Sequence, residues 1–429
     1  MQRFVLPAVL LAAFAASVAQ TIVIAALPAI SREAGVHPAQ ATWALTAFML
    51  AGAVANPVAG RLGDLFGYRR VLLVCLGVFA VGSAVCALSH SFPVLLAGRA
   101  VSGVSAGVFP VAFGLVRQTL EDSRRAGVIA LLSAMFGLGG AVGMVVAGPV
   151  QDAWGTPWLF WPLLGLAALA LLLGTLVPRD AAAGGGRVDF VGAVLLAGAL
   201  VCLLLAISEA RIWHPVVVVL LLAGALVLFV VFTGVELSIA QPLVAVRLLR
   251  VRAVATVNGV TVIIGAAMFG AVTILPRLIQ DPAVFGLSAT EAGLVLIPTA
   301  VVMLVATPLT PRLGGRQALW LGAGLALAAY VLLAVVHDAM WAIHVANVLV
   351  GAGYGFCFAA LGNLVVNAVE QRQTGMATGV NTVARTAGAA VGAQLAAALP
   401  YTAGFVAFAL VAAVAVVAVG AVTPRYSPA

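Results

Sequence analysis

Long apolar segments, each nearly free of charged residues, fill most of the chain and constrain its fold more than any other feature. A membrane-spanning helix needs about 20 predominantly apolar residues, because the hydrocarbon core of a bilayer is about 30 Å thick. Fourteen segments meet this requirement. Their approximate bounds are 4–30, 40–60, 70–89, 92–117, 126–150, 157–177, 188–209, 214–235, 253–278, 288–309, 317–336, 340–368, 374–398 and 400–422. We therefore predict an all-α membrane protein with fourteen transmembrane helices.

The composition agrees with a chain that is dissolved in lipid. Hydrophobic residues make up 64% of the 429 residues and charged residues only 8%, whereas soluble domains carry about 25% charged residues. No soluble core could bury this much apolar surface, so the bilayer must be the solvent for most side chains. We expect a multi-pass protein of the cell membrane.

The net charge is +8, and all 21 basic residues are arginines because the chain has no lysine. The absence of lysine excludes a P-loop and a Schiff-base cofactor. The four cysteines lie in apolar segments without CxxC spacing, which argues against a metal site. We expect no cofactor, no metal and no nucleic-acid partner.

The positions of the arginines test the number of spans. With fourteen spans and a cytoplasmic N-terminus, sixteen of the 21 arginines fall on the cytoplasmic side, three fall on the other side, and Arg99 and Arg385 lie within spans. Cytoplasmic loops are enriched in basic residues. The sequence therefore predicts that both termini are cytoplasmic.

Three sequence blocks recur in the same order at nearly constant spacing, which indicates duplicated halves. The matching pairs are residues 56–63 with 307–314, Gly103 and Gly107 with Gly351 and Gly355, and residues 139–143 with 388–392. We predict an N-terminal six-span bundle over 1–178, a linker with two inserted spans over 179–251, and a C-terminal six-span bundle over 252–429. Two parallel repeats around a central cavity are typical of secondary transporters.

The connection after the second segment combines glycines, one acidic residue and several arginines. Its candidate gating residues are Gly60, Arg61, Gly63, Asp64, Gly67, Arg69 and Arg70. Glycines permit tight turns, and an acidic residue beside arginines can form a latch that breaks and reforms. The stretch resembles the G-x-L-a-D-r-x-G-r-k signature of the major facilitator superfamily, although Leu65 replaces a commonly basic residue. The resemblance implies a cytoplasmic gate; the alternative is an ordinary basic loop.

Arg99 lies inside the fourth segment, in a stretch similar to the l-x-x-x-R-x-x-q-G pattern of the same superfamily. A charge in the hydrocarbon is costly, so the side chain should face the bundle interior or water. The resemblance implies a part in proton transfer or in organising the cavity. A structural arginine bonded to backbone carbonyls is the alternative.

Two further stretches resemble exporters of this superfamily. The second stretch resembles one subgroup, the fourteen-span drug:proton antiporters. Gly139, Gly143 and Gly148 are similar to the antiporter signature g-x-x-x-G-P-x-x-G-G, with Met144 where proline is expected. The corresponding segment 374–398 places Asn381 and Arg385 on one helical face with two glycines. The resemblance implies a helix-packing motif in the first stretch and cavity residues in the second.

The main departure from that subgroup is Ala19, which stands where the subgroup has an intramembrane aspartate. The cavity is left with neutral and basic groups, which suit a neutral or anionic solute better than a cation. The coupling and cavity residues that we predict are Arg99, Gln20, Arg385, Asn381 and Asn347.

We expect a secondary active transporter that exports small amphipathic molecules, drug-like or antibiotic-like, in exchange for protons, and that works as a monomer. An importer or uniporter of a neutral or anionic metabolite is the first alternative. The remote alternative is an intramembrane enzyme, for which residues 103–107 give a formal G-x-S-x-G match. That motif needs a strand-to-helix turn, so close helix packing explains the glycines better and we expect no enzyme and no catalytic residues.

Overall fold

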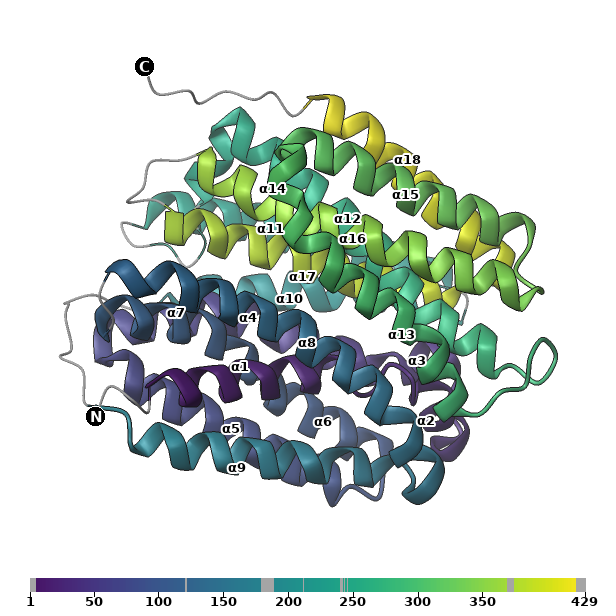
Figure 1. Cartoon of the computed structure of the whole chain (residues 1–429), viewed down its shortest axis with the longest axis horizontal. Helices are drawn as coiled ribbons and strands as arrows, with labels where there is room; N and C mark the ends of the chain where they lie inside the picture. The colour runs from purple at the N-terminus through teal and green to yellow at the C-terminus, as the bar shows by residue number, and fades with distance from the viewer. Residues whose placement is uncertain are drawn as a thin grey trace.

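The computed structural model describes residues 5–119, 122–178, 189–210, 212–239, 242, 244, 246–368 and 374–421, and among these residues the regular structure is entirely helical. The predicted linker at 179–187 lies outside the described residues. Figure 1 shows the helices of the first 175 residues lying together on one side of the molecule and those after residue 252 on the other.

The N-terminal group of helices contains α1 (Val5–Thr21), α2 (Leu27–Ala34), α3 (Pro38–Ala41), α4 (Trp43–Phe66), α5 (Tyr68–Ala87), α6 (Phe92–Ser102), η2 (Gly103–Gly107), α7 (Val108–Thr119), α8 (Asp122–Trp154), η3 (Thr156–Leu159) and α9 (Phe160–Thr175). The central pair is α10 (Phe190–Ser208) and α11 (Pro215–Ser238). The C-terminal group contains η4 (Val246–Arg250), α12 (Arg252–Gln280), α13 (Ala289–Ala306), η5 (Thr307–Leu309), α14 (Thr310–Leu313), α15 (Gly315–Val335), α16 (Met340–Asn367), α17 (Thr374–Ala398) and α18 (Tyr401–Ala421).

Every predicted apolar segment contains helix, but the count of fourteen spans is not confirmed. Among the described residues, eleven helices are long and apolar enough to cross a membrane. The predicted segments missing from that set correspond to α1, α8 and α17. Helix α1 is apolar but has only 17 residues, and α17 is long but carries more polar residues. Helix α8 includes residues whose side chains the structure does not describe.

The two groups repeat the same pattern of packing. In the N-terminal group α1 packs on α8, α5 on both α6 and α9, and α4 on α6 with η2. In the C-terminal group α12 packs on α17, α15 on both α16 and α18, and α13 on α16. The groups meet along two contacts that the repeat also relates, α8 with α13 and α17 with α4. This agrees with the duplicated halves that the sequence blocks indicate.

The first predicted segment, 4–30, is not one continuous helix. The α-helix ends at Thr21, and α2 begins at Leu27 after a stretch of turns. Pro28 has no amide hydrogen, so it cannot donate to the carbonyl of Ile24, which accepts from Leu27 instead. The proline therefore explains the break.

The predicted loop after the second segment is also different in the structure. Helix α4 continues through Phe66 and α5 begins at Tyr68, so only Gly67 is non-helical between them. Gly67 has φ +90° and Gly314 has φ +78°, a region of the backbone map that favours glycine. These two turn glycines are structural equivalents, so the predicted pairing of Gly63 with Gly314 is wrong at this point.

The central pair of helices differs from the rest in its exposure. Helix α10 contacts α17 and α4, whereas α11 packs chiefly on α10. Helix α11 exposes large apolar side chains such as Val219, Leu220 and Leu226, which is the expected surface of a helix that faces lipid. By contrast, most residues of α12 are buried, so this helix lies inside the bundle.

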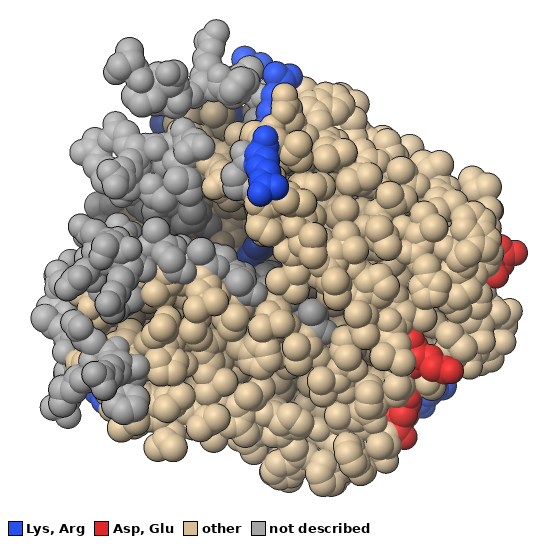
Figure 2. All heavy atoms as spheres, viewed as in Figure 1, with Lys and Arg blue, Asp and Glu red and all other residues tan. Residues whose placement is uncertain are grey.

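We name the two ends of the bundle by the elements that they carry. The distal end holds α2, α3 and the connection between α12 and α13 (Figure 1). The proximal end is the opposite end, and it holds the turn between α4 and α5 and the turn between α14 and α15. On the face in view in Figure 2, acidic side chains gather at the distal end and most of the arginines lie toward the proximal end.

Candidate functional site

The candidate gating residues lie at the proximal end, around the junction of α4 and α5. Gly60 and Arg61 are half-buried near the end of α4, and Gly63 is buried where a Cβ would overlap the ring of Tyr68. The backbone of Asp64 is helical, but its side chain lies outside what the structure describes. The gating role therefore stays a prediction.

One of these residues, Arg69, has an equivalent in the other half. The Arg69 guanidinium donates to the carbonyl of Thr175 at 2.6 Å, which joins the start of α5 to the end of α9. The Arg316 guanidinium donates to the carbonyl of Gly420 at 3.2 Å, which joins the start of α15 to the end of α18. A guanidinium near the last carbonyls of a helix also interacts favourably with the helix dipole. Arg70, next to Arg69, is exposed.

Arg99 is fully buried between the helices of the N-terminal half. Its Nε atom donates to the carbonyl of Ala44 at 2.7 Å, and Nη1 donates to the carbonyl of Ala19 at 2.9 Å. The guanidinium lies over the ring of Phe48, 4.4 Å from its centroid, which adds a cation–π attraction. This geometry fits a structural arginine that ties α6 to α1 and α4.

Asn347 occupies the equivalent place in the C-terminal half. It is fully buried in α16, and its Nδ2 atom donates to the carbonyl of Val295 in α13 at 2.8 Å. Its Oδ1 atom accepts from the Thr299 hydroxyl at 2.9 Å. Arg99 and Asn347 thus have the same structural role: Arg99 joins α6 to α4, and Asn347 joins α16 to α13.

The other three predicted cavity residues are half-buried. Gln20 lies near the end of α1. On α17, the Asn381 amide donates to Asn258 Oδ1 at 3.2 Å and to Thr261 Oγ1 at 2.7 Å, so it forms a polar cluster with α12. Arg385 stacks over the ring of Phe358, 5.6 Å from its centroid. The structure therefore separates the predicted set into two residues packed within the halves and three that are partly accessible.

The predicted helix-packing glycines lie where helices approach most closely. A Cβ at Gly139 would be 2.6 Å from Ser17 Cβ of α1, and a Cβ at Gly143 would overlap the Thr21 hydroxyl. The equivalent glycines of α17, Gly388 and Gly392, would overlap backbone carbonyls of α12. Small residues at such positions allow two helix backbones to pack in contact.

Gly148 serves a different contact, because it faces the other half of the molecule. A Cβ there would overlap the backbone of Ala289 and Thr290 at the start of α13. One turn further along α8, the Asp152 carboxylate accepts from the amide of Thr290 at 2.8 Å and from that of Ala289 at 3.3 Å. An acidic group from one half thus caps a helix of the other.

Two buried hydrogen bonds also cross between the halves. Gln280 Nε2 donates to the carbonyl of Ala25 at 2.8 Å, and Gln394 Nε2 donates to the Thr46 hydroxyl at 3.1 Å. We call these two bonds, together with the Asp152 cap, the distal seam. They lie toward the distal end, where they join the halves.

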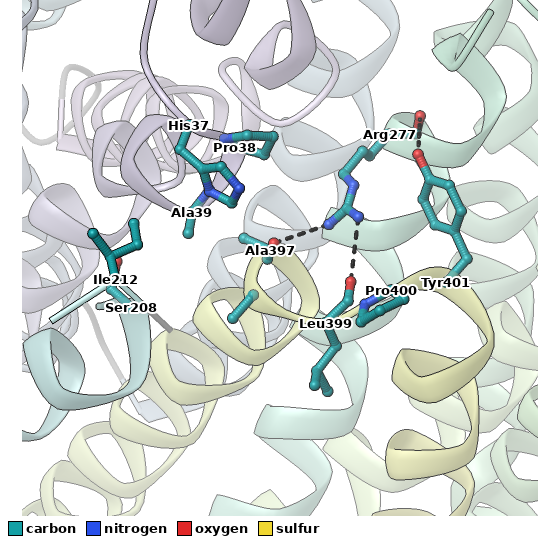
Figure 3. Close-up of a pocket in the computed structure, with 11 residues that line it drawn as sticks. His37, Pro38, Ala39, Ser208, Ile212, Arg277, Ala397, Leu399, Pro400 and Tyr401 are labelled. Atoms are coloured by element: carbon teal, nitrogen blue, oxygen red, sulfur yellow. Dashed lines mark hydrogen bonds between the residues drawn. The ribbon is translucent and has the colours of Figure 1, made fainter. Parts of the chain in front are cut away.

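Two cavities adjoin this seam, and neither is lined by any of the five predicted cavity residues. The larger, of about 370 Å³, lies between the α2–α3 connection, the end of α10 and the end of α17 (Figure 3). At its edge Arg277 donates to the carbonyls of Ala397 and Leu399, while the Tyr401 hydroxyl donates to Asp281 at 2.7 Å. That hydrogen bond lowers the pKa of the Asp281 carboxyl, with further lowering by the Ala283 amide and by Arg277.

The buried carboxylates of the described residues lie at the ends of the central pair. Asp189 caps α10 through the Gly192 amide at 2.8 Å, and Glu236 of α11 accepts from the Val244 amide at 3.2 Å. Glu209 lies just beyond α10 and accepts from Ser208. Among the described residues, no three potential ligands come close enough together to hold a metal ion.

Sequence reasoning did not identify the distal seam or its cavities. Thr273, Arg277 and Gln280 recur at steps of four and three, so they share one face of α12. That spacing was available as a signal. The pairing of Asp152 with α13 was not, because it joins residues 137 and 138 positions apart.

The comparisons with known proteins agree with this architecture. The sequence profile described as Major Facilitator Superfamily matches residues 9–393, with a second match over 257–429. An "uncharacterized MFS-type transporter" of Mycobacterium tuberculosis is 32% identical over 403 residues, which cover 91% of this chain and 58% of that protein. "Multidrug resistance protein 3" of Bacillus subtilis is 25% identical over 409 residues, which cover 92% of this chain and 78% of that protein.

A solved structure supports the fold. The chain superimposes on the crystal structure of the human organic anion transporter MFSD10 with a TM-score of 0.68 at 18% identity, covering 97% of this chain and 99% of that one. The matched proteins are transporters, so the enzyme alternative is excluded. The chain, which spans less than two thirds of the length of the Mycobacterium relative, belongs to the major facilitator superfamily.

Proposed function

We propose that the chain is a proton-coupled exporter that carries small amphipathic, uncharged or anionic solutes across the cell membrane by alternating access. Members of its family carry small-molecule solutes. The observation that carries the proposal is the distal seam. Within the contact of the two pseudo-symmetric halves, which also includes the packing of α8 on α13 and of α17 on α4, it contributes one helix cap and two hydrogen bonds, polar contacts that can break and reform during each cycle.

The proposal includes fourteen spans with both termini in the cytoplasm. Helix α1 occupies the position in its half that α12, a helix long enough to span, occupies in the other half. Helices α8 and α17 are equivalent to each other, and they pack against the spanning helices α13 and α12. The excess of arginine at one set of connections favours a cytoplasmic proximal end. The distal end would then face outward, and the structure would have its outer side closed.

Export rather than import is supported by the glycines of α8 and by the relatives. Gly139 and Gly143 hold α8 on α1, and Gly148 holds it against α13 of the other half. Helix α8 thus contacts both α1 of its own half and α13 of the other half. A relative that matches most of this chain is named a multidrug resistance protein.

The solute class follows from the side chains that the bundle interior offers. Ala19, at the position where related exporters have an acid, is fully buried, and its carbonyl accepts from Arg99. The half-buried polar groups are the amides Gln20 and Asn381 and the cation of Arg385. A cation would find no acidic partner among these groups, whereas an anion would find a guanidinium.

Transport into everted membrane vesicles tests the proposal. We expect uptake of uncharged and anionic amphipathic solutes that collapses when an uncoupler is added, and little uptake of a quaternary cation such as ethidium. Robust uncoupler-sensitive ethidium uptake by the natural chain would refute the charge argument. Uptake only in right-side-out vesicles would favour the importer alternative.

The gating proposal needs its own variant. Asp64→Asn should impair this uptake while the amount of protein in the membrane stays near normal, because a lost latch shifts the population of states rather than the fold. Asp338→Asn, at an exposed loop of the C-terminal half, is the matched control. Unchanged uptake in Asp64→Asn would make the stretch an ordinary basic connection.

A further inference from the structure

Three exposed tryptophans lie together at the distal end, where α8 ends and α9 begins (Figure 1). Trp154 is the last residue of α8, Trp158 lies in η3, and Trp161 is the second residue of α9. Their exposed fractions are 63%, 51% and 41%. The ring centroids of Trp154 and Trp158 are 6.1 Å apart, and those of Trp158 and Trp161 are 6.5 Å apart. The three rings therefore form one aromatic surface, which we call the tryptophan patch.

The indole N–H groups of the tryptophan patch are available to a partner outside the protein. Trp43, which is half-buried, donates its N–H to the Ser208 hydroxyl at 3.1 Å. Among the described residues, no acceptor pairs with the N–H of Trp154, Trp158 or Trp161. An indole has an apolar body and one polar N–H, so an exposed one favours a boundary that is apolar on one side and wet on the other.

The surface of α9 that continues from the patch is apolar. Leu169, Leu172 and Leu176 are 48%, 61% and 47% exposed. They follow Trp161 at steps of eight, three and four residues, which places the four side chains on one face of the helix. In a membrane protein, an exposed apolar face of this kind contacts hydrocarbon.

Charged side chains, by contrast, border the patch where α8 ends. Asp152 is exposed two residues before Trp154, and Arg32 and Glu33 of α2 are exposed as well. The Glu33 carboxylate lies beside the end of α8, because it accepts from the Gln151 amide at 2.7 Å. The patch thus lies between an apolar helix face and a group of charges. The headgroup region of a bilayer offers both environments, and tryptophan is enriched there.

Exposed tryptophans recur at two other distal connections. Trp213 lies just before α11 and Trp341 is the second residue of α16, and they are 40% and 59% exposed. Both helices then expose apolar side chains, such as Val219 of α11 and Val345 of α16. Tryptophans at the ends of three lipid-facing surfaces indicate a common level in the bilayer.

We propose that the tryptophan patch lies in the lipid headgroup region on the distal side of the bilayer, so that the distal seam opens at the same depth. Asp152, whose carboxylate caps α13, precedes Trp154 by two residues, which is about 3 Å along the axis of α8. The partner of the patch is therefore the headgroup layer, and the seam parts beside that layer rather than in bulk water. The proposal depends neither on the direction of transport nor on a proton.

Quenching by brominated lipids tests the depth of the patch. The purified protein is reconstituted into phosphatidylcholine vesicles that carry bromine either near the headgroup or near the end of the acyl chains. The signal of the patch is the difference in fluorescence between the natural chain and a variant with Trp154→Phe, Trp158→Phe and Trp161→Phe, which keeps three exposed aromatic rings. We expect this signal to be lost chiefly in the lipid that is brominated near the headgroup.

Trp43→Phe is the matched control, because Trp43 is half-buried and bonded to Ser208. The difference signal of Trp43 should be quenched much less by either lipid. Stronger quenching of the patch by the deep bromine would overturn the proposal, and so would quenching by aqueous iodide without any quenching by lipid. A patch signal that no quencher reaches would assign these rings to contact with a second copy of the chain, which would also overturn it.

A label beside the seam tests the depth at which the seam lies. Ala153 is exposed between Asp152 and Trp154, so Ala153→Cys can carry a fluorophore. The background lacks the four native cysteines, which are replaced by alanine: Cys75, Cys86, Cys202 and Cys357. The label should be quenched more by a nitroxide on the lipid headgroup than by a nitroxide in the acyl chain. Quenching only by a water-soluble nitroxide would refute the placement of the seam. Neither measurement requires transport, so a failure of export in vesicles would leave both results standing.

Discussion

The two halves of the molecule share a scaffold but differ in the polar side chains that they bury. Equivalent turns, equivalent arginine-to-helix-end hydrogen bonds and equivalent glycine contacts recur in both. At the fourth segment, however, one half buries Arg99 over Phe48, and the other buries Asn347 beside Thr299. Backbone-level contacts have therefore been kept in both halves, whereas the buried side chain at this position has diverged to a cation in one half and a neutral amide in the other.

The largest expected effect comes from removing the buried arginine. Arg99→Ala should cost about 4 kcal/mol of folding free energy, since it removes the hydrogen bonds to the carbonyls of Ala44 and Ala19 and opens a cavity. Asn347→Ala removes the hydrogen bonds to Val295 and Thr299 and should cost about 1–2 kcal/mol. The measurement is the thermal melting of purified protein in detergent. Equal melting temperatures for the two variants would break the comparison.

Substitution of the packing glycines should destabilise the C-terminal half more than the N-terminal half, the reverse of the order expected for Arg99 and Asn347. Gly392→Ala would drive a Cβ into a backbone carbonyl of α12, which cannot move away, and should cost about 3 kcal/mol. Gly143→Ala would meet the Thr21 side chain first and should cost about 1–2 kcal/mol. Gly379→Ala, with open space at its Cβ, is the control and should melt no lower than the natural chain. A larger loss in Gly143→Ala than in Gly392→Ala would contradict the packing described above.

The sequence predicts the helical architecture and the duplication well, because both depend on local hydropathy and on repeated motifs. It predicts Gly139 and Gly143 at a helix contact for the same reason. It fails where the outcome depends on contacts between distant segments. Nothing local in Asp152 indicates that it caps α13, and nothing local in Arg99 reveals which carbonyls it bonds. The break before Pro28 could have been predicted, since proline removes a helix hydrogen bond.

A substitution in the distal seam should have a smaller effect than the substitutions within either half. Asp152→Asn removes the charge that faces the N-terminus of α13 and should shift the closed state by about 0.3–1 kcal/mol, less at high salt. The alkylation rate of a cysteine at the seam, Ala153→Cys, should rise up to about fivefold. Glu291→Gln changes the charge within α13 itself and is the matched control. The same rise in both variants would mean that overall charge, rather than the cap, sets the population.

The smallest expected effect is a pH dependence at the distal end. The Tyr401 hydrogen bond lowers the pKa of Asp281, so its stabilising contribution is present above the ordinary carboxyl range and is lost as pH falls through the lowered value. Tyr401→Phe should therefore melt slightly below the natural chain at neutral pH, with the difference shrinking below about pH 4. A difference that stays constant from pH 7 to pH 3 would assign the effect to packing of the ring on Arg277.

The most direct test of the account is a reversible lock on the distal seam. Asp152 and Thr290 contact each other across the two halves, so Asp152→Cys with Thr290→Cys, in a chain without other cysteines, can be joined by a short cleavable cross-linker. We predict that solute uptake into everted vesicles stops when the cross-link forms and returns when it is cleaved, while each single-cysteine variant is unaffected by the reagent. Uptake that continues at the same rate with the halves joined would contradict alternating access through this seam.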